Sequence, residues 1–182
     1  MLELRYPPPV KIMAGIFWNN KTSRATAIRL LEQKWGPPDF ASEPAPFTYS
    51  NYYASEMGTD LIRQVFSFPT LAQPEHLADY KHLTNSMETT LTEKGQRTVN
   101  IDIGYLDYHR LVLASTKESY HRIYMGKGIW AELTLLYQNG GWVALPWTYP
   151  DFRQGIYDDT LRQARERYKE QIRKSSEKSG KH

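Results

Sequence analysis

A short segment near the start of the chain, Val10–Trp18, constrains the fold more than any other because it is apolar almost throughout. Its nine residues do not alternate between polar and apolar positions, and they are too few for a typical buried helix. A short continuous apolar run of this kind is typical of a strand that is buried on both faces. The segment therefore predicts a central strand of a sheet.

The segments that follow alternate between helical and extended patterns. Ile28, Leu31 and Trp35 recur at helical spacing, and Gly36 followed by two prolines ends that helix. The same reasoning predicts a helix at 22–35, an edge strand or extended loop at 40–53, a strand at 61–68, a helix from Pro74 to Gly95 and a strand at 97–103. This order of elements is that of the ferredoxin-like split βαβ unit.

The second half of the chain adds elements to this core. Residues 106–116 fit either a short helix or a strand, and Asp107 as a helix cap favours the helix. The remaining patterns predict antiparallel strands at 120–125, 129–137 and 142–145, and a final helix at 156–174. We therefore expect an α+β fold with a ferredoxin-like split βαβ core, added C-terminal antiparallel strands and a terminal helix. Residues 1–174 would form a single domain, and residues 175–182 a disordered tail.

The composition excludes several classes of protein and of site. The absence of cysteine excludes disulfides, thiolate metal sites and a cysteine nucleophile. No apolar stretch approaches the roughly 18 residues of a membrane helix, and the N-terminus does not resemble a signal peptide, so we expect a cytoplasmic protein without membrane contact. The net charge of +3 lies wholly in residues 151–182. The neutral remainder disfavours nucleic acid as a partner.

Polar and aromatic side chains gather between Asn100 and Asp151, at expected turns and strand ends. A binding or catalytic site needs charged donors and acceptors that converge on one concave place. Asp102 and His121 are the candidate catalytic residues, as an acid–base pair. The candidate ligand-binding residues are Asn100, Tyr105, Lys117, Arg122, Lys127, Glu132, Trp147 and Tyr149. No two histidines have a familiar metal-ligand spacing, so no metal site is expected, and the sequence specifies no cofactor.

The cations of this segment have two interpretations. Lys117, His121 and Arg122 would hold a phosphate or carboxylate of a ligand, or they would form ordinary ion pairs with Glu132 or Asp102. His121 and Arg122 are adjacent on an expected strand, so their side chains would leave opposite faces. At most one of them would then share a face with a given ligand.

The turns and aromatic residues also have structural alternatives. Trp147 and Tyr149 lie between two prolines, and they would stack a planar ring or cover one end of the core. Gly126-Lys127-Gly128 resembles a phosphate loop only superficially, because a P-loop continues with Ser or Thr and a helix. A hairpin turn with an exposed lysine is favoured there. Gly104, which follows the strand that carries Asp102, would serve a turn.

Five segments carry a resemblance to a known family: Pro9–Lys11, Asn100–Leu106, Leu111–Lys117, His121–Ile129 and Leu145–Asp151. They resemble an uncharacterised prokaryotic family, domain of unknown function 4416, and the likeness extends from about residue 9 to 172. The resemblance implies little about activity, although members are often labelled GTP-binding proteins by automatic transfer. The sequence does not support that label, because it lacks a P-loop and an Asp-x-x-Gly motif, and Asn20-Lys21 is not followed by x-Asp.

Three hypotheses about function follow. The first is a protein that binds a small anionic ligand or nucleotide, as an enzyme or not, in which the cations hold the anion, Asp102 acts as base and Trp147 or Tyr149 stacks. It requires that these groups converge on one pocket. The second is a non-catalytic homodimer that associates through an exposed apolar patch. The third is an RNA-associated protein, against which the neutral body of the chain and the absence of an RNP-like motif both count.

Overall fold

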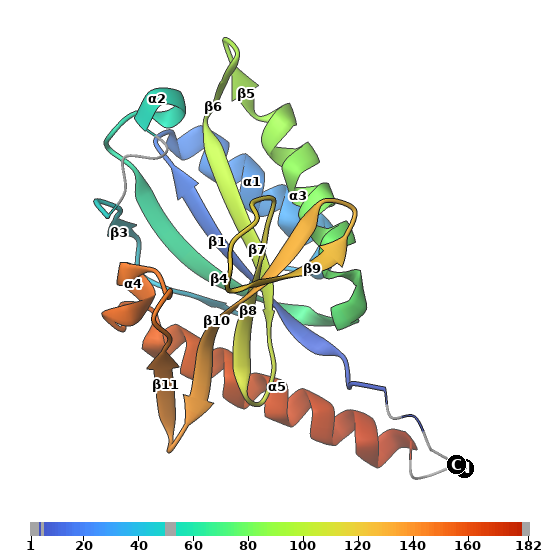
Figure 1. The fold of residues 1–182 in the computed structure, drawn as a ribbon. Coiled ribbons are helices and arrows are strands. Elements are labelled where there is room, and N and C mark those ends of the chain that lie inside the picture. Colours follow the sequence, from blue (N-terminus) through green and yellow to red (C-terminus); the bar gives the residue numbers. More distant parts are fainter. Residues whose placement is uncertain (1–3, 5, 50–53, 180–182) are drawn as a thin grey trace.

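A computed structural model describes residues 4, 6–49 and 54–179. Within them the fold is α+β, with one large antiparallel sheet between helices (Figure 1). The strands are β1 (Val10–Trp18), β2 (Phe40–Ala41), β3 (Ala45–Pro46), β4 (Ile62–Ala72), β7 (Val99–Leu106), β8 (Arg110–Ser115), β9 (Arg122–Gly126), β10 (Ile129–Gln138) and β11 (Gly141–Ala144). Their order is β11-β10-β8-β7-β1-β4-β2, while β3 pairs with β4 and β9 pairs with β10.

The helices and one small hairpin complete the fold. They are α1 (Lys21–Trp35), α2 (Ala54–Met57), the 3₁₀ turn η1 (Pro74–His76), α3 (Leu77–Thr90), α4 (Pro150–Arg153) and α5 (Asp158–Ser179), with β5 (Thr92–Glu93) and β6 (Gln96–Arg97) forming the hairpin. In Figure 1, α1 and α3 lie on one side of the sheet and α5 crosses the other side.

Strand β1 is an interior strand of the sheet, as its apolar sequence predicts. All nine of its residues are buried, and it pairs with β4 on one side and with β7 on the other. Ile12 and Ile16 belong to the core that includes residues of α1 and α3. Met13 points the opposite way and belongs to the core that includes Leu161 and Tyr168 of α5. Helices therefore cover both faces of this strand, which explains why it has no polar face.

Most elements lie close to where the sequence predicts them, with differences at their ends. The segment 40–53 contributes the short strands β2 and β3, and its residues 50–53 lie outside the described part of the chain. The helix that Pro74 opens ends at Thr90 rather than at Gly95, which lies in the turn between β5 and β6. Helix α5 includes residues 175–179, which we expected to be disordered, and residues 180–182 are not described.

The prediction of a helix at 106–116 is wrong, because this segment contains strand β8. Asp107 is a cap, but of the turn between β7 and β8, where its Oδ1 accepts hydrogen bonds from the backbone N–H groups of His109 (2.8 Å) and Arg110 (2.9 Å). The residues from Leu111 to Ala114 are all buried. Such a continuous apolar run fits a strand with two covered faces better than it fits a helix with one.

Helix α5 docks through a narrow apolar stripe and carries charge elsewhere. Leu161, Ala164 and Tyr168 are fully buried, whereas Glu166 pairs with Arg165 and Lys169 on its outer surface. Neither α5 nor any other helix in the described ranges combines the length and the apolar character that crossing a membrane requires.

The sheet divides between β7 and β8, and this division positions the site. The two strands pair only from Gly104 to Leu106 of β7, although β1 pairs with β7 along its whole length. The edge of β7 before Gly104 therefore has no β8 backbone beside it. Two side chains of α3 take that place, since the backbone N–H of Ile101 donates to Glu88 (2.8 Å) and its carbonyl accepts from Lys81 Nζ (2.8 Å).

Gly104 lies at the point where the two strands separate, inside β7 rather than in the turn that we expected. A Cβ atom at this position would lie 2.1 Å from the carbonyl oxygen of Val112 and 2.7 Å from the Leu113 side chain. The close approach of the two backbones therefore requires glycine.

Candidate functional site

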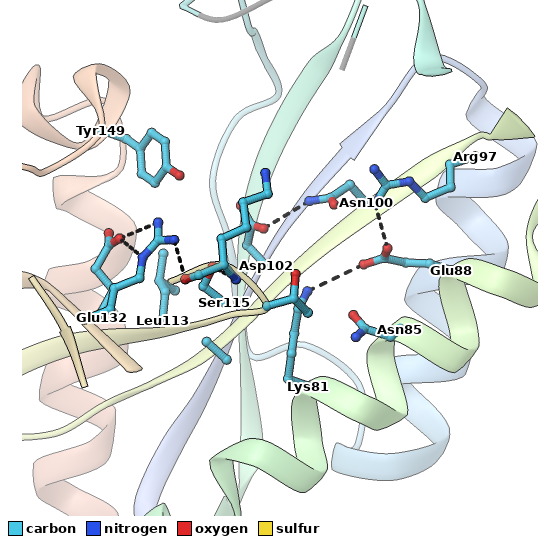
Figure 2. Close-up of a pocket in the computed structure, with 14 residues that line it drawn as sticks. Lys81, Asn85, Glu88, Arg97, Asn100, Asp102, Leu113, Ser115, Glu132 and Tyr149 are labelled. Carbon is cyan, nitrogen blue, oxygen red and sulfur yellow. Dashed lines mark hydrogen bonds and ion pairs between the residues drawn. The ribbon is translucent and has the colours of Figure 1, made fainter. Parts of the chain in front are cut away.

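A cavity of about 140 Å³ opens where the sheet divides (Figure 2). Its walls come from α3, β6, β7, the end of β8, β9, β10 and the residue before α4. The residues that line it are Lys81, Asn85, Glu88, Arg97, Asn100, Asp102, Leu113, Ala114, Ser115, Thr116, Lys117, Arg122, Glu132 and Tyr149. Since one water molecule needs only about 10 to 15 Å³, the cavity has room for a ligand of several heavy atoms.

Six of the ten candidate residues that we named from the sequence line this cavity: Asn100, Asp102, Lys117, Arg122, Glu132 and Tyr149. They span residues 100 to 149 of the chain and are brought together because β7, β8, β9 and β10 surround the division of the sheet. The sequence placed them on turns and strand ends but did not show that α3 forms the opposite wall.

The other four candidates do not line the cavity. Tyr105 lies on the opposite face of β7, where it packs against the core beneath α3. Lys127 is exposed in the turn between β9 and β10, and its Nζ binds Asp79 at 2.5 Å. That turn is the predicted hairpin, with φ of +55° at Lys127. His121 and Trp147 lie beside the cavity wall, and their rings stack at 5.1 Å between centroids with an angle of 14°.

Asp102 is held by two hydrogen bonds on the face of β7 that points away from α1. Its Oδ2 accepts from Arg63 at 3.1 Å, and its Oδ1 accepts from the Asn100 amide at 3.0 Å. Each carboxylate oxygen has a second lone pair, and the Asp102 side chain is 23% exposed. The carboxylate is therefore fixed in orientation and is still accessible to a ligand.

Arg63, which the sequence did not single out, joins Asp102 to the segment before α5. Its side chain is 1% exposed and binds Asp151 at 2.5 Å as well as Asp102. It reaches Asp102 across β1 at Gly15, where a Cβ atom would lie 3.1 Å from the guanidinium. Burial alone would lower the pKa of Arg63, but the two aspartates hold that pKa above its ordinary value.

The sequence offered only a weak signal for this arginine. Arg63 lies two positions before Val65 in β4, so the two side chains share a face of the strand, and a charge on an apolar face indicates a buried charge that needs partners. Those partners lie 39 and 88 positions away in the chain, so their identity could not be read from local patterns. Tyr157 completes the arrangement by donating to Asp151 Oδ2 at 3.1 Å, and burial raises the pKa of its hydroxyl.

Glu132 of β10 organises the opposite end of the cavity. Its Oε2 accepts hydrogen bonds from Arg122 Nε (2.9 Å) and from His121 Nε2 (3.0 Å). Adjacent strand residues were expected to leave opposite faces, but His121 precedes β9 and lies in the turn, so both side chains reach the same carboxylate. His121 Nδ1 also lies 3.0 Å from Ser119 Oγ. Both ring nitrogens therefore have protein partners, and His121 contacts the cavity through Glu132.

The wall formed by α3 and β6 consists of linked charges that the sequence analysis missed. Glu88 accepts from Arg97 at 3.2 Å, and Lys81 Nζ lies 3.7 Å from the same carboxylate. Arg97 also donates to Asn100 at 3.2 Å. The signal for this wall was the spacing of Lys81, Thr84 and Glu88 along one stripe of α3, where all three are buried.

Tyr149 lies at the mouth of the cavity, and Figure 2 shows its hydroxyl directed toward the interior. Burial raises the pKa of this hydroxyl, and the charges of Asp102 and Glu132 raise it further. The hydroxyl is therefore protonated at neutral pH and can donate a hydrogen bond to a ligand.

The charged groups that line the cavity include more cations than carboxylates. The lining contains four cations, which are Lys81, Arg97, Lys117 and Arg122, against three carboxylates, which are Glu88, Asp102 and Glu132. A concave surface with an excess of cations concentrates anions. Within the described ranges, no group of three or more histidine, aspartate or glutamate residues has an arrangement that would hold a metal ion.

Comparison with known proteins gives one finding. A family model described as "Domain of unknown function (DUF4416)" matches residues 8–168. No curated protein matches the chain, and no solved structure matches it.

Proposed function

Because the chain belongs to the family described as Domain of unknown function (DUF4416), which names no activity, we propose a function from the site itself. We propose that the protein binds a small anionic molecule in the cavity between β7 and β8. The observation that carries this proposal is the convergence of polar side chains from α3 and from strands β6 to β10 on one cavity, with more cations than carboxylates. The chemistry of the ligand is then set by the groups that it meets there.

Two groups at the mouth are best suited to meet the anion. Lys117 is exposed at the rim and carries a flexible point charge. Tyr149 directs a neutral hydroxyl inward (Figure 2). Asp102, held by Arg63 and Asn100, faces the same space and accepts a hydrogen bond from a hydroxyl or amine of the ligand. Because the ion pair with Arg63 fixes Asp102 before a ligand arrives, that carboxylate needs little ordering on binding.

We further infer that the core is ferredoxin-like. Strands β1 and β2 are both antiparallel to β4, which lies between them, and strands β4 and β7 are both antiparallel to β1, which lies between them. Helix α1 connects the first pair and helix α3 connects the second. β1 and β2 are therefore parallel to each other with β4 between them, and β4 and β7 are parallel to each other with β1 between them. This interleaving of two βαβ units supports the interpretation.

A thermal-shift screen with a matched pair of variants tests the binding proposal. Inorganic phosphate, sugar phosphates and nucleotides are the ligands to screen, and one present at about 100 times its Kd adds about 2.7 kcal/mol to the free energy of unfolding. For a chain of this size that raises the melting temperature by about 5 to 10 °C. We expect Lys117→Met to reduce the shift strongly and Lys127→Met, outside the cavity, to leave it unchanged. Equal shifts in the two variants, or no shift with any ligand, would contradict the proposal.

The exposed surface of β9 favours a second candidate function, association of two copies of the chain. Ile123 is 72% exposed, Tyr124 56% and Met125 39%, on a strand that pairs only with β10 within the described residues. An exposed apolar edge strand is a common site of pairing between chains. Light scattering is expected to show a dimer that Ile123→Glu converts to a monomer, and a monomeric wild-type protein at about 100 μM would count against this function.

A further inference from the structure

One carboxylate oxygen of the cavity lining is buried and has no hydrogen-bond donor. It is Oε1 of Glu132, a residue that is 2% exposed. The donors that reach this side chain, Arg122 and His121, both bind the other oxygen, Oε2. Among the residues that the structure describes, none donates to Oε1. A buried, charged acceptor without a donor destabilises the folded protein, so a ligand that donates to this oxygen removes that cost.

Asp102, which also lines the cavity, keeps both acceptor capacity and negative charge. Its ion pair with Arg63 is shared, because the same guanidinium binds Asp151. One positive charge therefore faces two carboxylates. Of these two, Asp151 is 1% exposed, whereas Asp102 lines the cavity and is 23% exposed. The negative charge that Arg63 does not compensate is thus offered to a ligand through Asp102.

The pairing of the strands places both carboxylates on one face of the sheet. Leu113 of β8 lies opposite Gly104 of β7 on one side and opposite Glu132 of β10 on the other. Directly opposed residues of antiparallel strands share a face, and so do residues two positions apart in one strand, such as Asp102 and Gly104. Burial raises the pKa of the Tyr149 hydroxyl, and both carboxylates raise it further, as expected of charges that lie near the same group.

Charge decides which kind of donor suits these two carboxylates. A hydroxyl group donates one hydrogen bond and carries no charge, whereas a protonated amine donates up to three and carries a positive charge. Hydrogen bonds between an ammonium and a carboxylate are roughly twice as strong as those between neutral groups. Asp102 lacks a cation of its own, and Glu132 Oε1 lacks a donor within the described residues. A protonated amine supplies both.

We propose that the ligand of the cavity carries a protonated amine, which binds Asp102 and Glu132 Oε1, in addition to its acid groups. This inference rests on the proposed function, because it names a second group of the same anion. An anion that contains an ammonium needs at least two negative charges, and the acidic amino acids are the simplest ligands of this class. Their acid groups remain for the cations of the lining and for the Asn85 amide, which has no side-chain partner within the described residues.

Calorimetric titration with three probes of equal length tests the assignment: L-glutamate, 2-hydroxyglutarate and glutarate. They carry the same two carboxylates and differ in one substituent, which is an ammonium, a hydroxyl group or hydrogen. L-Glutamate is expected to bind at least about tenfold more tightly than either of the others. Glu132→Gln and Asp102→Asn are each expected to weaken L-glutamate by about tenfold. The same variants should bind glutarate as tightly as the wild type or more tightly, because a negative charge is removed. Glu75→Gln, at an exposed glutamate outside the cavity, is the matched control and should bind all three probes as the wild type does.

The outcomes separate this inference from the proposed function. If glutarate binds as tightly as L-glutamate, or if neither Glu132→Gln nor Asp102→Asn reduces the difference between them, the inference is overturned and anion binding stands. If 2-hydroxyglutarate binds as tightly as L-glutamate, a neutral donor is sufficient and the protonated amine is overturned. If none of the three probes binds the wild-type protein, the inference is overturned, and the thermal-shift screen with phosphates and nucleotides decides the proposed function by itself. Melting temperatures without ligand verify folding, and Asp102→Asn alone decides if Glu132→Gln does not fold.

Discussion

Replacing Arg63 with methionine should be among the most destabilising single changes in this protein. The substitution keeps an unbranched side chain between the rings of Phe17 and Phe152, whose centroids lie 4.4 and 4.7 Å from the guanidinium carbon. It removes the only cation that the structure places beside both Asp102 and Asp151 within the described residues. Among the described residues, Asp151, which is 1% exposed, would keep only the Tyr157 hydroxyl as a side-chain donor.

The size of the effect follows from burial. Removing one partner of a buried ion pair costs about 3 to 5 kcal/mol, because the other charge stays desolvated and unpaired. Here two carboxylates lose the same partner, so we expect Arg63→Met to lower the free energy of unfolding by at least about 4 kcal/mol. That is a large fraction of the 5 to 15 kcal/mol that is typical of a natural domain.

Urea unfolding followed by tryptophan fluorescence measures this change, with the slope m as a check on two-state behaviour. Arg29→Met, on the exposed face of α1, is the matched control and should change the stability by less than about 0.5 kcal/mol. Adding Asp102→Asn and Asp151→Asn to Arg63→Met removes the stranded charges and should recover roughly half of the loss. A loss below about 1 kcal/mol for Arg63→Met, or no recovery in the triple variant, would refute the electrostatic argument.

Two further predictions concern the sheet and the alkaline limit of stability. Gly104→Ala places a Cβ 2.1 Å from the Val112 carbonyl oxygen and should lower the free energy of unfolding in urea by at least about 3 kcal/mol. The Cβ of Gly141→Ala meets no atom within 4 Å, so this control should be nearly neutral. Equal effects of the two substitutions would contradict the close approach of β7 and β8. Burial raises the pKa of Tyr157 above its ordinary value of 10, so its contribution to stability is fully present below pH 10 and falls by about 1.4 kcal/mol per pH unit above it. Unfolding measured between pH 9 and 11 should therefore show a shallower decline for Tyr157→Phe than for the wild type, and a change of slope as large in Tyr6→Phe, an exposed position, would argue against burial as the cause.

Local patterns were sufficient for most of the fold because burial leaves a mark on the sequence. The apolar run of β1 and the helical spacing in α1 both reflect which faces are covered. The segment of β8 was misassigned because an aspartate side chain caps helices and turns with the same kind of hydrogen bond, and Asp107 caps a turn here. Only the neighbouring strands distinguish the two, and they come from distant parts of the chain.

Sequence patterns predicted only one wall of the candidate site. Polar residues at turns and strand ends indicated Asn100, Asp102 and Glu132, because binding and catalytic residues are concentrated on such segments. The wall that contains Lys81 and Glu88 was missed, since its polar residues face the sheet from a helix whose apolar stripe looks ordinary. The role of these residues depends on where β7 and β8 separate, and tertiary contacts alone determine that position.

The most direct test of ligand binding in this cavity is a titration of the ¹⁵N-labelled protein with the anion that gives the largest thermal shift, followed by amide chemical shifts. The largest shifts are expected at the side-chain amides of Asn85 and Asn100 and at the backbone of residues 115–117, with none in the turn that contains Lys127. Shifts concentrated elsewhere, for example along α5, or an unchanged spectrum at millimolar ligand, would contradict binding between β7 and β8.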